Sequence, residues 1–177
     1  MHQIGFIGLG TMGLPIATHL VNRGFSLKLY ARRKEVFETI AENLVKLGAI
    51  PCKTISEVCD GVDVLITNIT GTDDVESVLL SSDDPAIKSL KKNSLVIDHS
   101  TIDPNRTQLI AKTLKDENIN MVDAPVSGGS AAAKSGQLIV MLGGEDACCK
   151  RAEKIISTYA KTITIVGANG HGQIAKL

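Results

Sequence analysis

Short apolar runs alternate with longer amphipathic stretches along the chain, and this alternation predicts strands separated by helices. The apolar runs predict strands at residues 4–7, 27–30, 62–68, 95–98, 121–122, 138–142 and 162–166. The amphipathic stretches predict helices over residues 12–23, 34–47, 85–91, 104–117 and 147–159, with glycines at 24 and 48 ending the first two. Strands that are continuous hydrophobic runs are typical of a parallel sheet covered by helices on both faces. The pattern therefore predicts a doubly wound α/β fold.

A glycine-rich turn joins the first predicted strand to the first predicted helix. Its sequence, Gly8-Leu9-Gly10-Thr11-Met12-Gly13, fits the pattern G-x-G-x-x-G inside a β-α-β unit of about 30 residues, the arrangement that binds dinucleotides in Rossmann-type folds. The first glycine permits the tight turn, the second lets the backbone approach a pyrophosphate, and the third lets the helix pack on the strand. The alternative is a glycine-rich turn with a structural role only.

The residues after the second predicted strand bear on which dinucleotide binds. NAD-binding domains usually carry an acid there, bonded to the ribose 2′-hydroxyl. This chain instead has Ala31-Arg32-Arg33-Lys34, and arginine offers a planar set of donors to a 2′-phosphate. The sequence therefore favours NADP as the cofactor. NAD stays possible if the basic residues are a solvated helix start and Glu35 serves as a displaced acid.

Composition excludes several other classes of function. The 177 residues are 44% hydrophobic and 21% charged with a formal net charge of zero, which gives no electrostatic footprint for nucleic acid or an anionic membrane. No apolar run is long enough for a transmembrane helix, and the first strand begins too early for a leader peptide. The four cysteines lack metal-ligand spacing and are expected to be free thiols in the cytoplasm.

Three motifs resemble those of the β-hydroxyacid dehydrogenases, the family that includes 3-hydroxyisobutyrate dehydrogenase. The first is the glycine turn with its flanks, residues 5–17. The second is Asp123-Ala124-Pro125-Val126-Ser127-Gly128-Gly129, continuing through 136–144. The third is Gly170-His171-Gly172-Gln173-Ile174-Ala175-Lys176. Their order, and their spread over nearly the whole chain, make the resemblance specific.

The resemblance implies a role for each motif. Ser127, Gly128 and Gly129 would hold the substrate carboxylate, and Lys176 would be the general acid/base as a hydride moves to or from the cofactor. Further cofactor contacts would come from Ile69, Thr70 and Thr101. The candidate cofactor residues are Gly8, Leu9, Gly10, Thr11, Met12, Gly13, Ala31, Arg32, Arg33, Ile69, Thr70, Asp74 and Thr101.

Simpler interpretations stand beside these roles. Ser127–Gly129 could be an ordinary loop, and Lys176 could be a solvated lysine. His99 and His171 are expected to be structural or peripheral, and Asp123 to organise its loop. No metal site is expected, because the acidic pairs at 73–74 and 83–84 lie where acids cap helices.

The chain also departs from the family's pattern. The family often has Leu-Pro at the positions of Ile69-Thr70, and the loop after Gly129 lacks the Glu-Glu pair of 6-phosphogluconate dehydrogenase. Residues 1–165 are expected to form the nucleotide-binding domain and 166–177 to begin an interdomain catalytic helix. The resemblance implies an all-helical domain after that helix, so we expect this chain to bind cofactor but to be a poor catalyst by itself.

The leading hypothesis is an oxidoreductase that uses NADP(H) and a small β-hydroxy acid or semialdehyde. The alternatives are a dinucleotide-binding module without activity, which would lack the lysine, and an imine reductase, where another residue usually takes the lysine's position. The full-length protein is expected to be a homo-oligomer, with no nucleic-acid or membrane partner.

Overall fold

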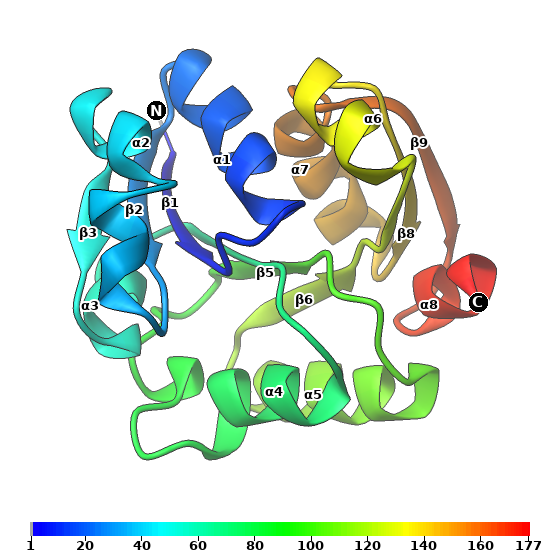
Figure 1. The fold of residues 1–177 in the computed structure, drawn as a ribbon. Helices are drawn as coiled ribbons and strands as arrows, with labels where there is room; N and C mark the ends of the chain where they lie inside the picture. The colour runs from blue at the N-terminus through cyan, green and yellow to red at the C-terminus, as the bar shows by residue number, and fades with distance from the viewer. Residues whose placement is uncertain (1) are drawn as a thin grey trace.

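The computed structural model describes residues 2–177 as a mixed nine-stranded sheet with helices on both faces (Figure 1). The strands are β1 (Gln3–Ile7), β2 (Ser26–Tyr30), β3 (Ile50–Cys52), β4 (Val64–Thr67), β5 (Leu95–Asp98), β6 (Asn120–Asp123), β7 (Val126–Ser127), β8 (Leu138–Gly143) and β9 (Ala160–Gly167). Their order is β3-β2-β1-β4-β5-β6-β8-β7, with β9 also paired to β8. The crossover from β3 on one side of β1 to β4 on the other makes the fold doubly wound, so the predicted Rossmann-type α/β class is confirmed.

Helices fill the connections between these strands. The α-helices are α1 (Gly13–Asn22), α2 (Glu42–Lys46), α3 (Ile55–Cys59), α4 (Thr72–Glu76), α5 (Pro104–Asp116), α6 (Gly129–Ser135), α7 (Asp146–Ile156) and α8 (His171–Lys176). Two 3₁₀ turns, Lys34–Glu38 and Ala86–Lys88, and a π-helical turn, Ser77–Ser81, complete the set.

The core has two layers because side chains of the central strands alternate between faces. Val64 and Ile66 of β4 pack into the layer beneath α1 and α7, whereas Leu65 packs into the layer beneath α3 and α5. All three side chains are fully buried. A strand that is buried on both faces has a continuous run of apolar residues in the sequence, which is why β1, β4 and β5 could be predicted.

Several predicted elements are wrong in detail. The helix over 34–47 is a 3₁₀ turn followed by α2, and the Thr39 hydroxyl, which donates to the Glu35 carbonyl at 2.7 Å, marks the break. The helix over 85–91 is only a short 3₁₀ turn. The strand expected over 62–68 is confined to β4, and the expected loop at 130–133 is helical, as part of α6.

The sheet is also not wholly parallel. β8 runs antiparallel to β6 and β7, whereas β9 is parallel to β8. The predicted parallel sheet is wrong at this edge. An apolar run in the sequence indicates that a strand is buried, but it does not indicate in which direction the strand runs. The direction follows from the connection between β6 and β8, which holds β7 and α6.

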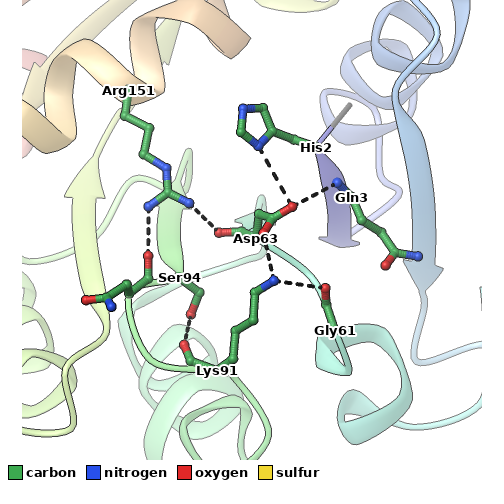
Figure 2. A network of polar contacts seen from close by, with 8 residues as sticks. His2, Gln3, Gly61, Asp63, Lys91, Ser94 and Arg151 are labelled. Carbon is green, nitrogen blue, oxygen red and sulfur yellow. Dashed lines mark hydrogen bonds and ion pairs between the residues drawn. The ribbon is translucent and has the colours of Figure 1, made fainter.

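A polar network joins the segments that lead into β1, β4 and β5 (Figure 2). Arg151 of α7 donates to the carbonyls of Asp63 and Asn93, both at 2.8 Å, and Lys91 Nζ donates to the Asp63 carboxylate at 2.7 Å. The hydrogen bond from Lys91 lowers the pKa of Asp63. The network secures the amino ends of the strands and leaves the carboxyl ends, where ligands bind in open α/β sheets, free for a site.

Candidate functional site

Two clefts meet at the carboxyl ends of β1 and β4. The larger has a volume of about 850 Å³ and runs from the glycine turn to the end of β2. The smaller has a volume of about 590 Å³ and lies between the loops after β4 and β5 and the segment around β7. Asn68, Ile69 and Thr70 line both clefts, so the two form one continuous surface.

The sequence-predicted residues divide between these clefts. The larger is lined by Gly8, Leu9, Gly10, Thr11, Ala31, Arg32, Arg33, Ile69, Thr70 and Asp74. The smaller is lined by Met12, Ile69, Thr70, Thr101, Ser127, Gly128, Gly129 and Lys176. Gly13 lines neither and is buried at the start of α1.

The glycine turn has the geometry that its sequence predicts. Gly8 has a φ of +103°, and a Cβ there would lie 2.1 Å from the Asn68 carbonyl oxygen. A Cβ on Gly13 would lie 1.8 Å from the Gly8 carbonyl oxygen, so only glycine lets α1 begin this close to the turn. A Cβ on Gly10 would meet nothing within 4 Å, which leaves this backbone open to the cleft. The turn therefore fits a pyrophosphate-binding role.

The end of β2 carries an ion pair that the sequence did not reveal. Arg32 Nη2 lies 3.3 Å from Asp74 Oδ1, with side chains 80% and 46% exposed. Asp74 lies in the first turn of α4, which is held against α5 by Arg106, whose Nη2 lies 3.0 Å from Asp73 Oδ1 and whose Nε donates to Glu76 at 2.7 Å. Lys134 of α6 also lines this cleft and was not predicted.

Hydrogen bonds beneath the junction hold its floor in place. The Ile69 amide donates to Ser100 Oγ at 3.0 Å, and the Ser100 amide donates to Asp98 Oδ1 at 3.1 Å. The Thr67 hydroxyl donates to the same Asp98 oxygen at 2.9 Å. Burial raises the pKa of Asp98 to about 6. This carboxyl group ties the loop after β4 to the loop after β5.

His99 also lines the smaller cleft, although its side chain is buried. Its Nδ1 lies 2.6 Å from the Ala124 carbonyl oxygen and its Nε2 lies 2.8 Å from the Tyr159 hydroxyl. Burial lowers the pKa of His99 to about 4, so the imidazole is neutral near pH 7. Nδ1–H then donates to Ala124, and Nε2 accepts from Tyr159. These contacts agree with the structural role expected for His99.

The segment from Ser127 to Gly129 lines the smaller cleft together with Lys176. Gly128 and Gly129 have φ values of +120° and +69°, a backbone conformation that favours glycine. A Cβ on Gly129 would meet nothing within 4 Å. The backbone at this end of β7 is therefore open to a ligand.

Helix α8, which carries Lys176, is anchored by two buried polar side chains. Asp123 accepts hydrogen bonds from the amides of Gly170 at 2.8 Å and Gln173 at 3.1 Å, and burial raises its pKa. The Gln173 side chain donates to the Ser100 carbonyl at 2.7 Å and accepts from the Ile102 amide at 3.1 Å. Together they fix the half-buried Lys176 relative to the loop that contains Thr101. The sequence predicted an organising role for Asp123 but not the role of Gln173.

The acidic pairs and the cysteines are arranged as follows. Asp73 and Asp74 lie in the first turn of α4, and Asp84 accepts a hydrogen bond from the Ser56 amide at 2.9 Å. Within residues 2–177 no three His, Cys, Asp or Glu side chains gather as they would around a metal ion.

All four cysteines are free thiols, as expected. In this same range no helix combines the length and apolarity needed to cross a membrane.

Comparison with known proteins identifies the family. A family model described as the NAD binding domain of 6-phosphogluconate dehydrogenase matches residues 3–167. The chain belongs to this family. It is 34% identical over 175 residues to 2-hydroxy-3-oxopropionate reductase of Escherichia coli, with 99% of this chain and 58% of that protein covered. It is 33% identical over 177 residues to NAD-dependent L-serine dehydrogenase of Pseudomonas aeruginosa, with 100% and 58% covered.

A solved structure gives the same result. The Mycobacterium tuberculosis 3-hydroxyisobutyrate dehydrogenase with L-serine superimposes with a TM-score of 0.89 and 29% identity, covering 99% of this chain and 58% of that one. The resemblance to the β-hydroxyacid dehydrogenases is thus confirmed. The chain spans 58% of the length of each of these three relatives.

Proposed function

We propose that the protein is an oxidoreductase that transfers a hydride between NADP(H) and a small β-hydroxy acid or its semialdehyde partner. The observation that carries this proposal is the meeting of the two clefts at Asn68–Thr70. One cleft has the open glycine turn and the other has Lys176, so a dinucleotide lying through both would bring its nicotinamide end to the lysine. Residues 1–165 form the nucleotide-binding domain in this proposal, and 166–177 begin the helix that delivers the lysine.

The glycine turn and the basic segment after β2 would hold the cofactor, which supplies or accepts the hydride when bound. The backbone at Gly10 is open toward the cleft, and the adjoining start of α1 offers amide groups to the phosphates. Arg32 and Arg33 line the far end of the same cleft. Of the other candidate contacts, Ala31 and Asp74 line the larger cleft, Thr101 lines the smaller one, and Ile69 and Thr70 line both.

We favour NADP over NAD on this chain's own residues. A 2′-phosphate carries charge that Arg32 and Arg33 can neutralise with charge-assisted hydrogen bonds. The acid that usually follows this strand and bonds the 2′-hydroxyl is replaced here by Ala31, which follows Tyr30. The relative from Pseudomonas aeruginosa is named NAD-dependent, so the preference rests on these residues and not on the relatives.

The smaller cleft would hold the substrate. The Ser127 hydroxyl and the backbone amides of Gly128 and Gly129 would bind its carboxylate, because the absence of side chains at the two glycines lets an anion approach. Lys176 would donate the proton to the carbonyl oxygen on reduction and remove it from the hydroxyl on oxidation. Ser130–Ala133 follow the glycines where a sugar-acid enzyme would have two glutamates, so we propose a short substrate.

The proposal extends to the protein as a whole. We propose that it acts in the cytoplasm, in keeping with its four free thiols, and that its full-length form is a homo-oligomer. Since the chain spans 58% of its relatives, we propose that residues 1–177 alone bind cofactor and turn over slowly.

A turnover assay tests the proposed function. The protein is mixed with NADPH and a panel of small semialdehydes, and with NADP⁺ and the corresponding hydroxy acids, while absorbance at the nicotinamide band is followed. Turnover of at least one short substrate, with NADPH preferred over NADH, is the expected result. Tight binding of cofactor without turnover of any substrate by the full-length protein would instead support a dinucleotide-binding module.

A further inference from the structure

Asn68 occupies the junction of the two clefts. It directly follows β4, and it lines both the cleft of the glycine turn and the cleft of Lys176. Its backbone is held firmly, since its amide donates to the Ile7 carbonyl at 2.9 Å. Its carbonyl oxygen lies so close to Gly8 that a Cβ there would approach it to 2.1 Å. The position of this residue relative to the glycine turn is therefore fixed by the fold.

The side-chain amide of Asn68 has a donor that the protein does not use. Among residues 2–177, three buried side-chain atoms have no hydrogen-bond partner, and they are Asn68 Nδ2, Ser82 Oγ and Asp98 Oδ2. Of these three residues only Asn68 lines either of the two clefts described above. A buried donor without a partner destabilises a folded protein, so one that persists at a ligand cleft calls for a partner from outside the chain.

The groups around Asn68 indicate which chemical group could accept a hydrogen bond from its side chain. The Ile69 amide is already bonded to Ser100 and the Ile69 side chain is apolar, so the neutral side-chain donors at this point are Asn68 and the Thr70 hydroxyl. Arg32 lies at the end of one cleft and Lys176 in the other, which puts Asn68 between the ends of the proposed cofactor path. A carboxamide N–H suits an oxygen of a hydroxyl or a phosphate.

We infer that the Asn68 side chain donates a hydrogen bond to the nicotinamide-side ribose phosphate of the dinucleotide. This inference rests on the proposed function and adds a cofactor-positioning residue to it. Cofactor binding then satisfies a group that is unsatisfied in the free protein. The Asn68 side chain therefore destabilises the free protein and stabilises its complex with the cofactor.

The test uses Asn68→Leu, which keeps nearly the same shape and removes the amide. Thermal unfolding without ligand is measured beside calorimetric titrations with NADP⁺ and with 2′,5′-ADP, which lacks the nicotinamide mononucleotide half and therefore the nicotinamide-side phosphate. We expect Tm to stay equal or rise, the Kd for NADP⁺ to increase about tenfold, and the Kd for 2′,5′-ADP to stay within about twofold. Ser82→Ala is the matched control, because it removes an unpartnered buried group away from both clefts and should leave both Kd values unchanged.

A second variant covers the case in which Asn68→Leu does not fold. Asn68→Asp keeps the size and places an acceptor where the donor was, so it should weaken NADP⁺ binding more than 2′,5′-ADP binding. Unchanged NADP⁺ affinity in a folded variant overturns the inference. So does a lower Tm with equal loss of affinity for both ligands, which would indicate a structural residue. If the wild-type chain binds neither NADP⁺ nor NAD⁺, the proposed function itself fails, and the inference falls with it.

Discussion

Arg32 and Asp74 form an ion pair at the end of the larger cleft, with 3.3 Å between Nη2 and Oδ1. Both side chains are well exposed, and exposed pairs of this kind contribute only about 0–1 kcal/mol to stability. The pair therefore breaks easily. In the proposed NADP complex Asp74 would therefore not be a favourable contact, because it pairs with the guanidinium that a 2′-phosphate would use and would repel that phosphate.

Replacing Asp74 by Asn should increase the preference for NADP⁺. Removing the carboxylate frees Arg32, so the Kd for NADP⁺ should fall by about twofold to fivefold, the size of one exposed charge interaction. The Kd for NAD⁺ should change less. Asp73→Asn is the matched control, because the neighbouring Asp73 pairs with Arg106 instead. Calorimetric titration of both variants measures the effect, and equal behaviour of the two would show that Asp74 does not oppose the phosphate.

The glycine turn predicts opposite outcomes for two alanine variants. Gly10→Ala should leave Tm nearly unchanged, because its Cβ meets nothing within 4 Å, but should weaken NADP⁺ binding at least about tenfold by blocking the pyrophosphate. Gly13→Ala should lower the free energy of unfolding by about 2 kcal/mol or more, because its Cβ would lie 1.8 Å from the Gly8 carbonyl oxygen. Urea unfolding and titration separate the two effects. A Gly10→Ala variant with full affinity would contradict the proposed phosphate site.

The glycine turn also illustrates which features could be predicted from sequence. Its signal is local, since three glycines at fixed spacing follow a buried strand, and the structure confirms the turn. β3 was missed because it has only three residues, one of them Pro51, and lies at the sheet edge, where proline is tolerated. Such a strand has no periodicity to detect.

The contacts that position the site residues could not be predicted. Asp123 and Gln173 are 50 residues apart, and their hydrogen bond depends on how β6 and α8 come together. The same holds for the unpartnered amide of Asn68, which has meaning only once both clefts are formed. The motifs at 127–129 and 176 could be found in the sequence, but the shared cleft could not.

His99 predicts a pH dependence of stability. Below about pH 6.5 the unfolded chain binds a proton at His99, whereas the folded chain, with a pKa of about 4, does not. The free energy of unfolding therefore decreases as the pH falls from about 6.5 to about 4. Relative to wild type, His99→Gln should therefore gain about 3 kcal/mol of stability between pH 7 and pH 4. Asp98 acts oppositely, because its pKa is raised to about 6 and the folded chain binds its proton first. For that reason the prediction concerns the difference between the variant and wild type.

Urea unfolding at pH 7 and pH 4 measures this difference. Tyr159→Phe serves as the control, because it removes the hydroxyl bonded to Nε2 but keeps the imidazole buried. It should retain the pH dependence of the wild type. If wild type and His99→Gln differ by the same amount at both pH values, His99 does not titrate in the way that its burial implies.

Replacing Lys176 by Met should separate catalysis from cofactor binding. In the full-length protein, kcat should fall by about 10²–10⁴, the usual contribution of a positioned acid/base. The Kd for NADP⁺ should stay within about twofold. Lys161→Met, on β9 and away from both clefts, is the matched control and should leave both quantities unchanged. Retained turnover in Lys176→Met would move the proton transfer to another group, with His171 the next residue to replace.

The central claim, that these clefts bind a dinucleotide through the glycine turn and Arg32, is tested most directly by one titration. The wild-type chain and Arg32→Ala are each titrated with NADPH and NADH by calorimetry. We predict that both ligands bind the wild type, that NADPH binds more tightly, and that Arg32→Ala removes about 1–3 kcal/mol of this preference. Equal affinities for NADPH and NADH in the wild type, or no binding of either, would contradict the account.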